Sequence, residues 1–272
     1  GYQEVLYVPL GIGMKKVKVC VLRTAGINCD QETAFAFSKV GGQAELVHIN
    51  DFIRQKNSLS DYQILALPGG FSYGDDIASG KVFANELKYK LEEELRKFIA
   101  DGKLIIGICN GFQVLVKSGL LPGNNNLEQE ASLIINDSGK FEDRWVYLKN
   151  SGKSAWTKDM PEIIYLPVAH GEGKFVVKDR SLLNRLKANK QVIFRYCSEQ
   201  GKPGGYPGNP NGSLDDIAGI SDATGRILGL MPHPERHIAS IQHPRRFSAR
   251  NGQAGDGLRI FKNGVEYIKK HL

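Results

Sequence analysis

The first half of the chain alternates short apolar runs with amphipathic segments, and this alternation constrains the fold more than any other feature. Helices are expected at 30–40, 84–100 and 111–120, where apolar side chains recur at helical spacing. Runs rich in Val, Ile and Leu have the length of buried strands at 17–22, 44–49, 64–67 and 103–108. Strands that alternate with helices predict a mostly parallel open sheet with helices on both faces, the α/β class.

The second half of the sequence has a different pattern. From residue 141 onward, strand-like segments follow one another closely, at 144–148, 163–169, 174–177, 192–197, 217–220 and 227–231. The last two flank the turn sequence Asp222-Ala223-Thr224-Gly225, which predicts a hairpin and therefore antiparallel additions to the sheet. An apolar stripe at 258–268 predicts a closing helix.

Domain organisation follows from the absence of any internal repeat or long linker in the sequence. Residues 14–272 are therefore interpreted as one domain. Met14 opens the sequence MKKVKVCVL, which has the character of a natural start, so residues 1–13 are interpreted as an added remnant or a loose extension. The opening segment lacks the basic and apolar regions of a signal peptide.

Charge and cysteine content limit the class of partner and compartment. The net charge is +7, from 36 basic and 29 acidic residues, but the lysines alternate with glutamates on expected helix faces, so no nucleic-acid partner is predicted. No apolar run approaches the ~18 residues of a membrane span, so no membrane partner is predicted either. The four cysteines show no paired spacing, which favours a reducing cytoplasm over a disulfide framework or a zinc ribbon.

The sequence GICNGFQ places Cys109 between Gly107 and Gly111 directly after a predicted buried strand. Gly-x-nucleophile-x-Gly at a strand-to-helix turn is a nucleophile elbow, which lifts the reactive side chain off the sheet. The following helix N-terminus favours the thiolate, and the amide of Asn110 can stabilise an oxyanion. A buried structural cysteine between packing glycines is the equally good alternative on this pentapeptide alone.

A thiolate nucleophile needs a base, and the base needs an acceptor that orients it. His233 follows the last predicted strand in MPHPER, and Glu235 two residues later can hold the far ring nitrogen. His170 lies in a turn after a predicted strand, and His48 is interpreted as a surface residue. The remaining histidines lie in polar or terminal surroundings, at His237, His243 and His271. A capping histidine with a surface glutamate remains an alternative. Zinc ligation by Cys, His and Glu is disfavoured, since a structural site needs a fourth ligand, and no metal is predicted.

Taken together, GICNGFQ and MPHPERH resemble the class I (triad) glutamine amidotransferases, which have a flavodoxin-like fold and use Cys, His and Glu. Further segments narrow the resemblance to the glutaminase subunits of phosphoribosylformylglycinamidine synthase, in purine biosynthesis. These segments are RTAGINCDQETAFAF, LPGGFSYGDD, NDSGKFEDRWV, LPVAHGEGKF and NPNGSLDDIAGI. The resemblance runs from about Met14 to the C-terminus, and HGEG and NPNGS are unlike the related GMP, CTP and anthranilate synthase glutaminases.

The resemblance implies roles for individual residues. Cys109 would be the nucleophile, His233 the base and Glu235 its orienting acceptor. Amides of Gly70 and Asn110 would stabilise the oxyanion. The glutamine pocket would be lined by Gln113 and by the backbone around Ala169, His170 and Gly171.

The resemblance also implies the partners and cofactors. The chain would hydrolyse glutamine and pass ammonia to a large ATP-dependent synthetase, aided by a small bridging subunit. ATP and Mg²⁺ would bind to the synthetase, and this chain would bind no cofactor. Two alternatives of another class stay open: a DJ-1/PfpI-like cysteine hydrolase, and an amidotransferase-like binding module without catalysis. A glutaminase serving another amidotransferase is the third.

Overall fold

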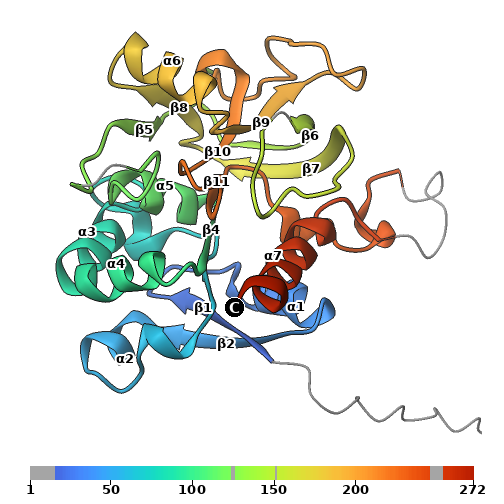
Figure 1. Cartoon of the computed structure of the whole chain (residues 1–272). Helices are drawn as coiled ribbons and strands as arrows, with labels where there is room; N and C mark the ends of the chain where they lie inside the picture. The colour runs from blue at the N-terminus through green and yellow to red at the C-terminus, as the bar shows by residue number, and fades with distance from the viewer. Residues whose placement is uncertain (1–15, 124–125, 151, 246–253) are drawn as a thin grey trace, which may run out of the picture.

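The structure is a computed structural model that describes residues 16–123, 126–150, 152–245 and 254–272. Within these residues, nine strands form one sheet in the order β2-β1-β3-β4-β11-β10-β9-β6-β7, and two further strands pair as β5-β8 (Figure 1). The predicted α/β class with parallel strands first and antiparallel additions later is confirmed. The extension expected at 1–13 lies outside the described residues.

Five neighbouring strands of the sheet run parallel. They are β1 (Val17–Arg23), β2 (Gly42–His48), β3 (Ile64–Leu67), β4 (Leu104–Ile108) and β11 (Ile227–Leu230). Every residue of β3, β4 and β11 is buried, which fits strands covered on both faces. Because parallel strands end at the same edge, the segments that follow β3, β4 and β11 are brought together there.

The remaining strands of the large sheet run antiparallel to their neighbours. They are β10 (Ile217–Ser221), β9 (Val192–Cys197), β6 (Glu142–Asn150) and β7 (Ile163–His170). Along β7 buried and half-buried residues alternate, as expected of a strand with one face on the core. The small sheet joins β5 (Ala131–Ile134) to β8 (Lys174–Val177).

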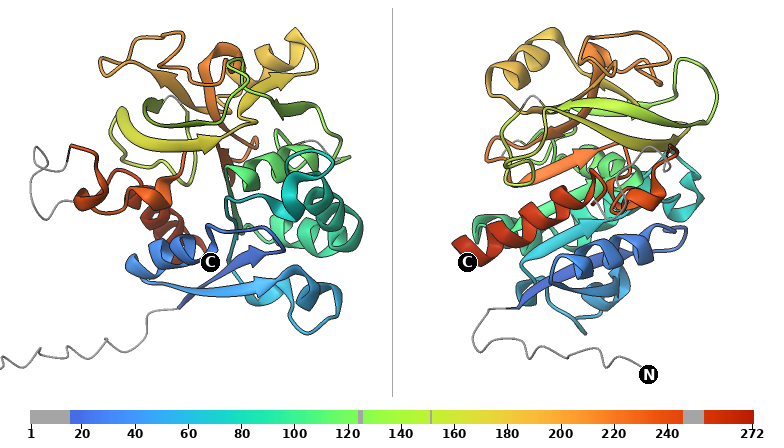
Figure 2. Two further views of the ribbon diagram at one scale, coloured as in Figure 1. Left: turned by 180° about the vertical axis from the view of Figure 1, so that it is seen from behind. Right: turned by 90° about the vertical axis from the view of Figure 1, so that its right-hand side faces the viewer.

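Helices cover both faces of the parallel half (Figures 1 and 2). On one face α1 (Asp30–Lys39) packs beside α7 (Leu258–His271), and Phe37 meets Phe261 edge to face at 4.9 Å. The other face carries α3 (Lys81–Lys90), α4 (Glu92–Ala100) and α5 (Asn110–Lys117). Two short helices, α2 (Ile49–Ile53) and α6 (Arg180–Ala188), lie at opposite ends of the molecule. No helix in the described part of the chain is both long and apolar enough to cross a membrane.

The helix predicted as continuous over 84–100 is wrong, because the structure breaks it at Leu91 into α3 and α4. Its apolar spacing is kept, since Leu87, Leu91, Leu95 and Phe98 are all buried. The charges around the break explain it. Lysines close the last turn of α3 and three glutamates open α4, so each helix end carries the charge that its dipole favours. The short elements α2, β5 and α6 were not predicted, because their apolar patterns are too brief to stand out.

Candidate active site

Cys109 lies at the turn between β4 and α5, at the edge where the parallel strands end. Its backbone has φ 50° and ψ −105°, a strained conformation for a residue with a side chain. Its N–H donates to the carbonyl of Leu230 at 2.8 Å, and its Sγ lies 3.7 Å from the carbonyl oxygen of Ala169. The thiol is thus held in a fixed position between the parallel strands and the end of β7.

The two glycines beside Cys109 are required by close packing. A Cβ on Gly111 would lie 1.9 Å from the carbonyl oxygen of Leu67, in the neighbouring strand β3. A Cβ on Gly107 would lie 2.5 Å from Leu115 of α5. The spacing that predicts an elbow therefore has a steric cause, since α5 can approach the sheet this closely only without those side chains.

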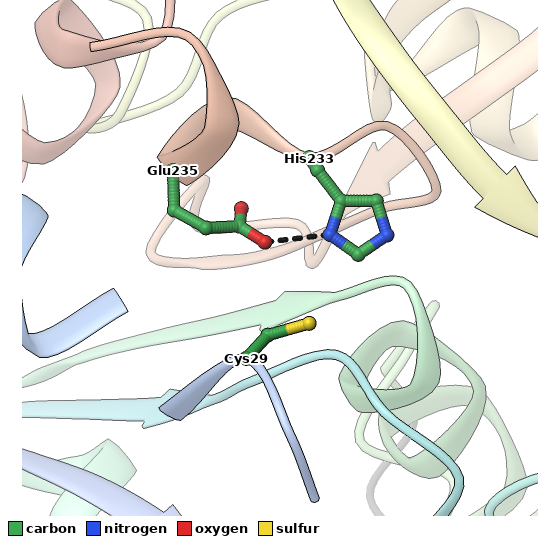
Figure 3. A group of neighbouring side chains, drawn as sticks. All are labelled: Cys29, His233 and Glu235. Atoms are coloured by element: carbon green, nitrogen blue, oxygen red, sulfur yellow. Dashed lines mark hydrogen bonds and ion pairs between the residues drawn. The ribbon is translucent and has the colours of Figure 1, made fainter. Parts of the chain in front are cut away.

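His233 follows β11, which pairs with β4 so that Leu230 lies opposite Ile108. This register places the residues after the two strands side by side. The Nδ1 of His233 is 2.5 Å from Oε1 of Glu235, and Pro234 fixes the short turn between them (Figure 3). Nε2, on the opposite edge of the ring, has no hydrogen-bond partner among the described residues.

Both members of this pair are almost fully buried, at 2 % exposure for His233 and 1 % for Glu235. Burial opposes a charge on the imidazole, but the carboxylate of Glu235 and the sulfur of Cys109 outweigh it and raise the pKa of His233 well above its ordinary range. The imidazole therefore keeps its second proton at neutral pH.

Cys29, at the start of α1, is a second thiol beside His233, and sequence reasoning assigned it no role (Figure 3). Ligand atoms of Cys29, His233 and Glu235 all lie within 4.8 Å of one another, so this set is the place where a metal ion could bind. The geometry favours a hydrogen-bonded pair instead, because Glu235 already holds Nδ1 and the Arg236 guanidinium donates to the Cys29 sulfur at 3.1 Å. A fixed cation at that sulfur opposes a second, divalent one.

Gly69 and Gly70 bring the loop after β3 against the same cluster. A Cβ on Gly69 would lie 2.7 Å from Cε1 of His233 and 3.1 Å from the Cys29 sulfur. Gly70 has φ +143° and lies opposite Ile27 in an isolated antiparallel bridge. The loop that carries Gly70 is therefore pressed against the imidazole of His233.

Asn110 is the first residue of α5, where backbone amides have no partner within the helix. Its side chain accepts from the amide of Ser72 at 3.2 Å and donates to Asp75 at 3.2 Å and to Gln113 at 2.9 Å. Burial raises the pKa of Asp75. Asp75 is the last residue of LPGGFSYGD, but no pattern in the sequence pointed to its contact with Asn110.

Gln113 and the end of β7 meet across the site. The Nε2 of Gln113 donates to the carbonyl of Glu172 at 2.6 Å. His170 ends β7 and is 3 % exposed, and neither ring nitrogen has a hydrogen-bond partner among the described residues. Burial lowers the pKa of His170 to about 3, so its imidazole is neutral. Every residue predicted for the site, from Gly70 to Glu235, therefore lies at one edge of the sheet.

One histidine was misplaced by sequence reasoning. His237 was interpreted as a residue in polar surroundings, but it is 4 % exposed and its ring packs 5.0 Å from that of Trp145. Its Nδ1 lies 2.7 Å from the carbonyl oxygen of Tyr165. The short turn after Pro234 directs it back toward the sheet, which its polar neighbours in sequence do not reveal.

Comparison with known proteins agrees with this geometry. The family model of the CobB/CobQ-like glutamine amidotransferase domain matches residues 16–268. The chain is 48 % identical over 268 residues to the phosphoribosylformylglycinamidine synthase subunit PurQ of Methanococcus maripaludis, covering 93 % of this chain and 98 % of that one. It is 47 % identical over 260 residues to the subunit PurQ of Dehalococcoides mccartyi, covering 94 % and 100 %.

The chain belongs to the PurQ family of phosphoribosylformylglycinamidine synthase subunits. A chain in the solved structure of PurLQS from Thermotoga maritima matches it with a TM-score of 0.72 and 33 % identity, over 93 % of this chain and all of that one. The PurQ likeness thus covers nearly the whole described structure. The DJ-1/PfpI-like alternative is not retained.

Proposed function

We propose that Cys109, His233 and Glu235 form the catalytic triad of a glutaminase. The observation that carries this proposal is the pairing of β4 with β11, which sets the residue after one strand beside the residue after the other. The buried contact between Glu235 and Nδ1 supports it further, because it leaves Nε2 free for proton transfer at the sulfur.

The reaction follows from the charges of the triad. The Cys109 thiolate attacks the side-chain carbonyl carbon of glutamine, and the electron pair of the C=O bond moves onto oxygen. Amides of Gly70 and Asn110 stabilise that oxyanion. His233 gives its proton to the amide nitrogen as the C–N bond breaks, releasing ammonia and leaving a thioester. His233 then takes a proton from water, whose oxygen attacks the thioester to release glutamate and restore the thiolate.

The substrate pocket lies between Cys109, Gln113 and the end of β7. We place the amide of glutamine at Cys109 and its amino-acid end against the backbone of Ala169, His170 and Gly171. Two contacts support the end of β7 as one side of this pocket: the Ala169 carbonyl lies 3.7 Å from Cys109 Sγ, and the Glu172 carbonyl accepts from Gln113.

The ammonia serves a reaction on another polypeptide. We propose that the chain supplies it to the large ATP-dependent synthetase that converts formylglycinamide ribonucleotide to formylglycinamidine ribonucleotide, with a small bridging subunit in the complex. The likeness to a chain of PurLQS supports these partners. ATP and Mg²⁺ bind to the synthetase in this proposal, and this chain binds no cofactor of its own. Four free cysteines support a reducing, cytoplasmic setting.

Ammonia rescue tests the proposal. A complex of this chain with its synthetase and bridging subunit is assayed for amidine formation with glutamine or with an ammonium salt. Cys109→Ala should abolish synthesis from glutamine and leave synthesis from ammonium at the wild-type rate. The matched control Cys197→Ala, at a buried thiol of β9, should keep both. Loss of both activities in Cys109→Ala contradicts the proposal, as does ATP-dependent amidation by this chain alone.

A further inference from the structure

The segment 169–173, which leaves β7 and turns toward β8, is held by three polar side chains from distant parts of the sequence. Asn136 accepts from the amide of Gly173 at 2.9 Å and donates to the carbonyl of His170 at 2.8 Å. Asn211 donates to the carbonyl of Gly173 at 2.8 Å, and the Ser213 hydroxyl donates to the same oxygen at 3.3 Å. Both ends of the 169–173 segment are therefore fixed by side chains.

These three side chains are themselves rigid. Asn136, Asn211 and Ser213 are 2 %, 0 % and 4 % exposed. Asn211 also donates to the hydroxyl of Tyr196 at 3.1 Å, and its Oδ1 accepts from the amide of Ser213 at 3.0 Å. Buried polar groups with complete partners specify one arrangement, because any shift leaves a donor or acceptor unpaired.

The packing around this network leaves no room for adjustment. A Cβ on Gly173 would lie 2.4 Å from Cε1 of His170 and 2.8 Å from Nδ2 of Asn211. Gly212 has φ +75°, and a Cβ there would lie 1.9 Å from a carboxylate oxygen of Asp137. The glycines of HGEG and NPNGS thus let the segments approach one another. The two sequence motifs that set this chain apart from other glutaminases form one structural unit.

The 169–173 segment presents different carbonyls on its two sides. Those of His170 and Gly171 face the network, since they accept from the side chain and the backbone amide of Asn136. Those of Ala169 and Glu172 face the site, where they lie against Cys109 Sγ and accept from Gln113. The network therefore decides where the wall of the glutamine pocket stands relative to the nucleophile.

We infer that Asn136 and Asn211 are positioning residues that set the affinity for the free amino-acid end of glutamine. This inference rests on the proposed function of the site. Neither side chain hydrogen-bonds to Cys109, His233 or Glu235. Their loss should displace the pocket wall, including the Ala169 carbonyl beside the sulfur, whereas the backbone of Cys109 stays bonded to Leu230 and keeps the nucleophile at the end of β4. A mutation that weakens binding of substrate and transition state alike raises KM and leaves kcat unchanged.

The experiment compares Asn136→Ala and Asn211→Ala with the exposed control Asn184→Ala of α6, each in the complete complex with synthetase and bridging subunit. Steady-state assays should give a glutamine KM raised about tenfold to a hundredfold in the two buried variants, with kcat and ammonium-dependent synthesis close to wild type. Asn136→Asp keeps the acceptor for Gly173 but sets a carboxylate oxygen against the carbonyls of His170 and Lys140, so its KM should rise at least as far as that of Asn136→Ala. Asn184→Ala should match wild type.

Two alkylating reagents separate recognition from reactivity. Iodoacetamide lacks an amino-acid end and should label Cys109 at the wild-type rate in both variants. Diazo-oxonorleucine carries that end and should label it more slowly, in proportion to the change in KM. Equal slowing with both reagents, or an unchanged KM, contradicts the inference.

Labelling of the wild-type complex distinguishes failure of this inference from failure of the proposed function. If diazo-oxonorleucine labels a residue other than Cys109 in wild type, the proposed triad is wrong. If wild type is labelled at Cys109 and the variants react equally fast, only the positioning role is wrong. Should an alanine variant fail to assemble, Ser213→Ala removes a single hydroxyl of the network and is compared with Ser213→Thr, which restores it.

Discussion

The parallel and antiparallel halves of the large sheet contribute different things to one site. In the parallel half, β4 and β11 are buried along their whole length, and their ends lead to Cys109 and His233. In the antiparallel half, buried and half-buried residues alternate along β7, and the end of this strand contributes the 169–173 segment. We interpret this as a division of labour: the parallel half carries the chemistry, and the antiparallel half carries recognition.

His233→Ala should have the largest effect, because it removes the base from the parallel half. We expect kcat for glutamine to fall by about 10³-fold or more, nearly as far as in Cys109→Ala, because members of a triad act as a unit. Stopped assays of glutamate release measure it, with ammonium-dependent synthesis as the control for an intact complex. If KM rises and kcat stays near wild type, the assignment of the chemistry to the parallel half is wrong.

Glu235→Gln should lower kcat for glutamine by about tenfold to a hundredfold. This loss is smaller than that of His233→Ala, since Glu235 orients the base and does not react. It should also shift the pH profile. Glu235 helps to raise the pKa of His233, so its removal lowers that pKa. The imidazolium that protonates the leaving amide nitrogen is then lost at a lower pH, and the alkaline limb of kcat moves to lower pH. An alkaline limb that stays in place contradicts the assigned pair.

Cys29→Ala should have a small effect, although the Cys29 sulfur lies within 4.8 Å of ligand atoms of both His233 and Glu235. Burial raises the pKa of its thiol, so it stays protonated and is a poor nucleophile. We expect kcat within about threefold of wild type, with diazo-oxonorleucine still bound to Cys109 by peptide mapping. Cys197→Ala is the matched control. A loss as large as that of Cys109→Ala makes Cys29 part of the chemistry.

Asp222→Ala should affect stability and leave the reaction unchanged. Its carboxylate accepts from the amides of Arg226 and Ile227 at 2.9 Å each, and from Thr224, which closes the hairpin between the two halves. We expect the free energy of unfolding to drop by about 2 kcal/mol, measured by urea titration. The exposed control Asp143→Ala should change it by less than about 0.5 kcal/mol. If the folded variant has a lower kcat, the prediction is wrong and the hairpin also affects the function of His233.

Much of the fold could be predicted from the sequence because the patterns that indicate each element are local. The valine-rich run at β1, the exact four-residue run at β3 and the turn at Asp222 each predict their element from neighbours in sequence. The break at Leu91 was not readable from hydrophobic spacing, which continues through it. Helix α6 was missed because its apolar stripe is brief: only Leu182 and Leu186 are buried along it.

The candidate site likewise contains residues that the sequence predicts and residues that it does not. The elbow glycines and the two-residue spacing from His233 to Glu235 mark a nucleophile, a base and its acceptor by local pattern alone. Cys29 and Asp75 were not found, because they reach the site from loops whose sequences carry no catalytic spacing. Asn136 and Asn211 lay in quoted motifs, but their contacts with Gly173 join segments far apart in the chain.

The sequence by itself determined which groups can react, because an elbow and a His-x-Glu turn are built by residues next to one another. Tertiary structure alone decided that these groups meet. Strand β11 comes more than a hundred residues after β4 and still enters the sheet as its parallel neighbour, with β10 folding back on its other side. The pairing is set by burial of two apolar strands between layers of helices, and this non-local contact leaves no local trace in the sequence.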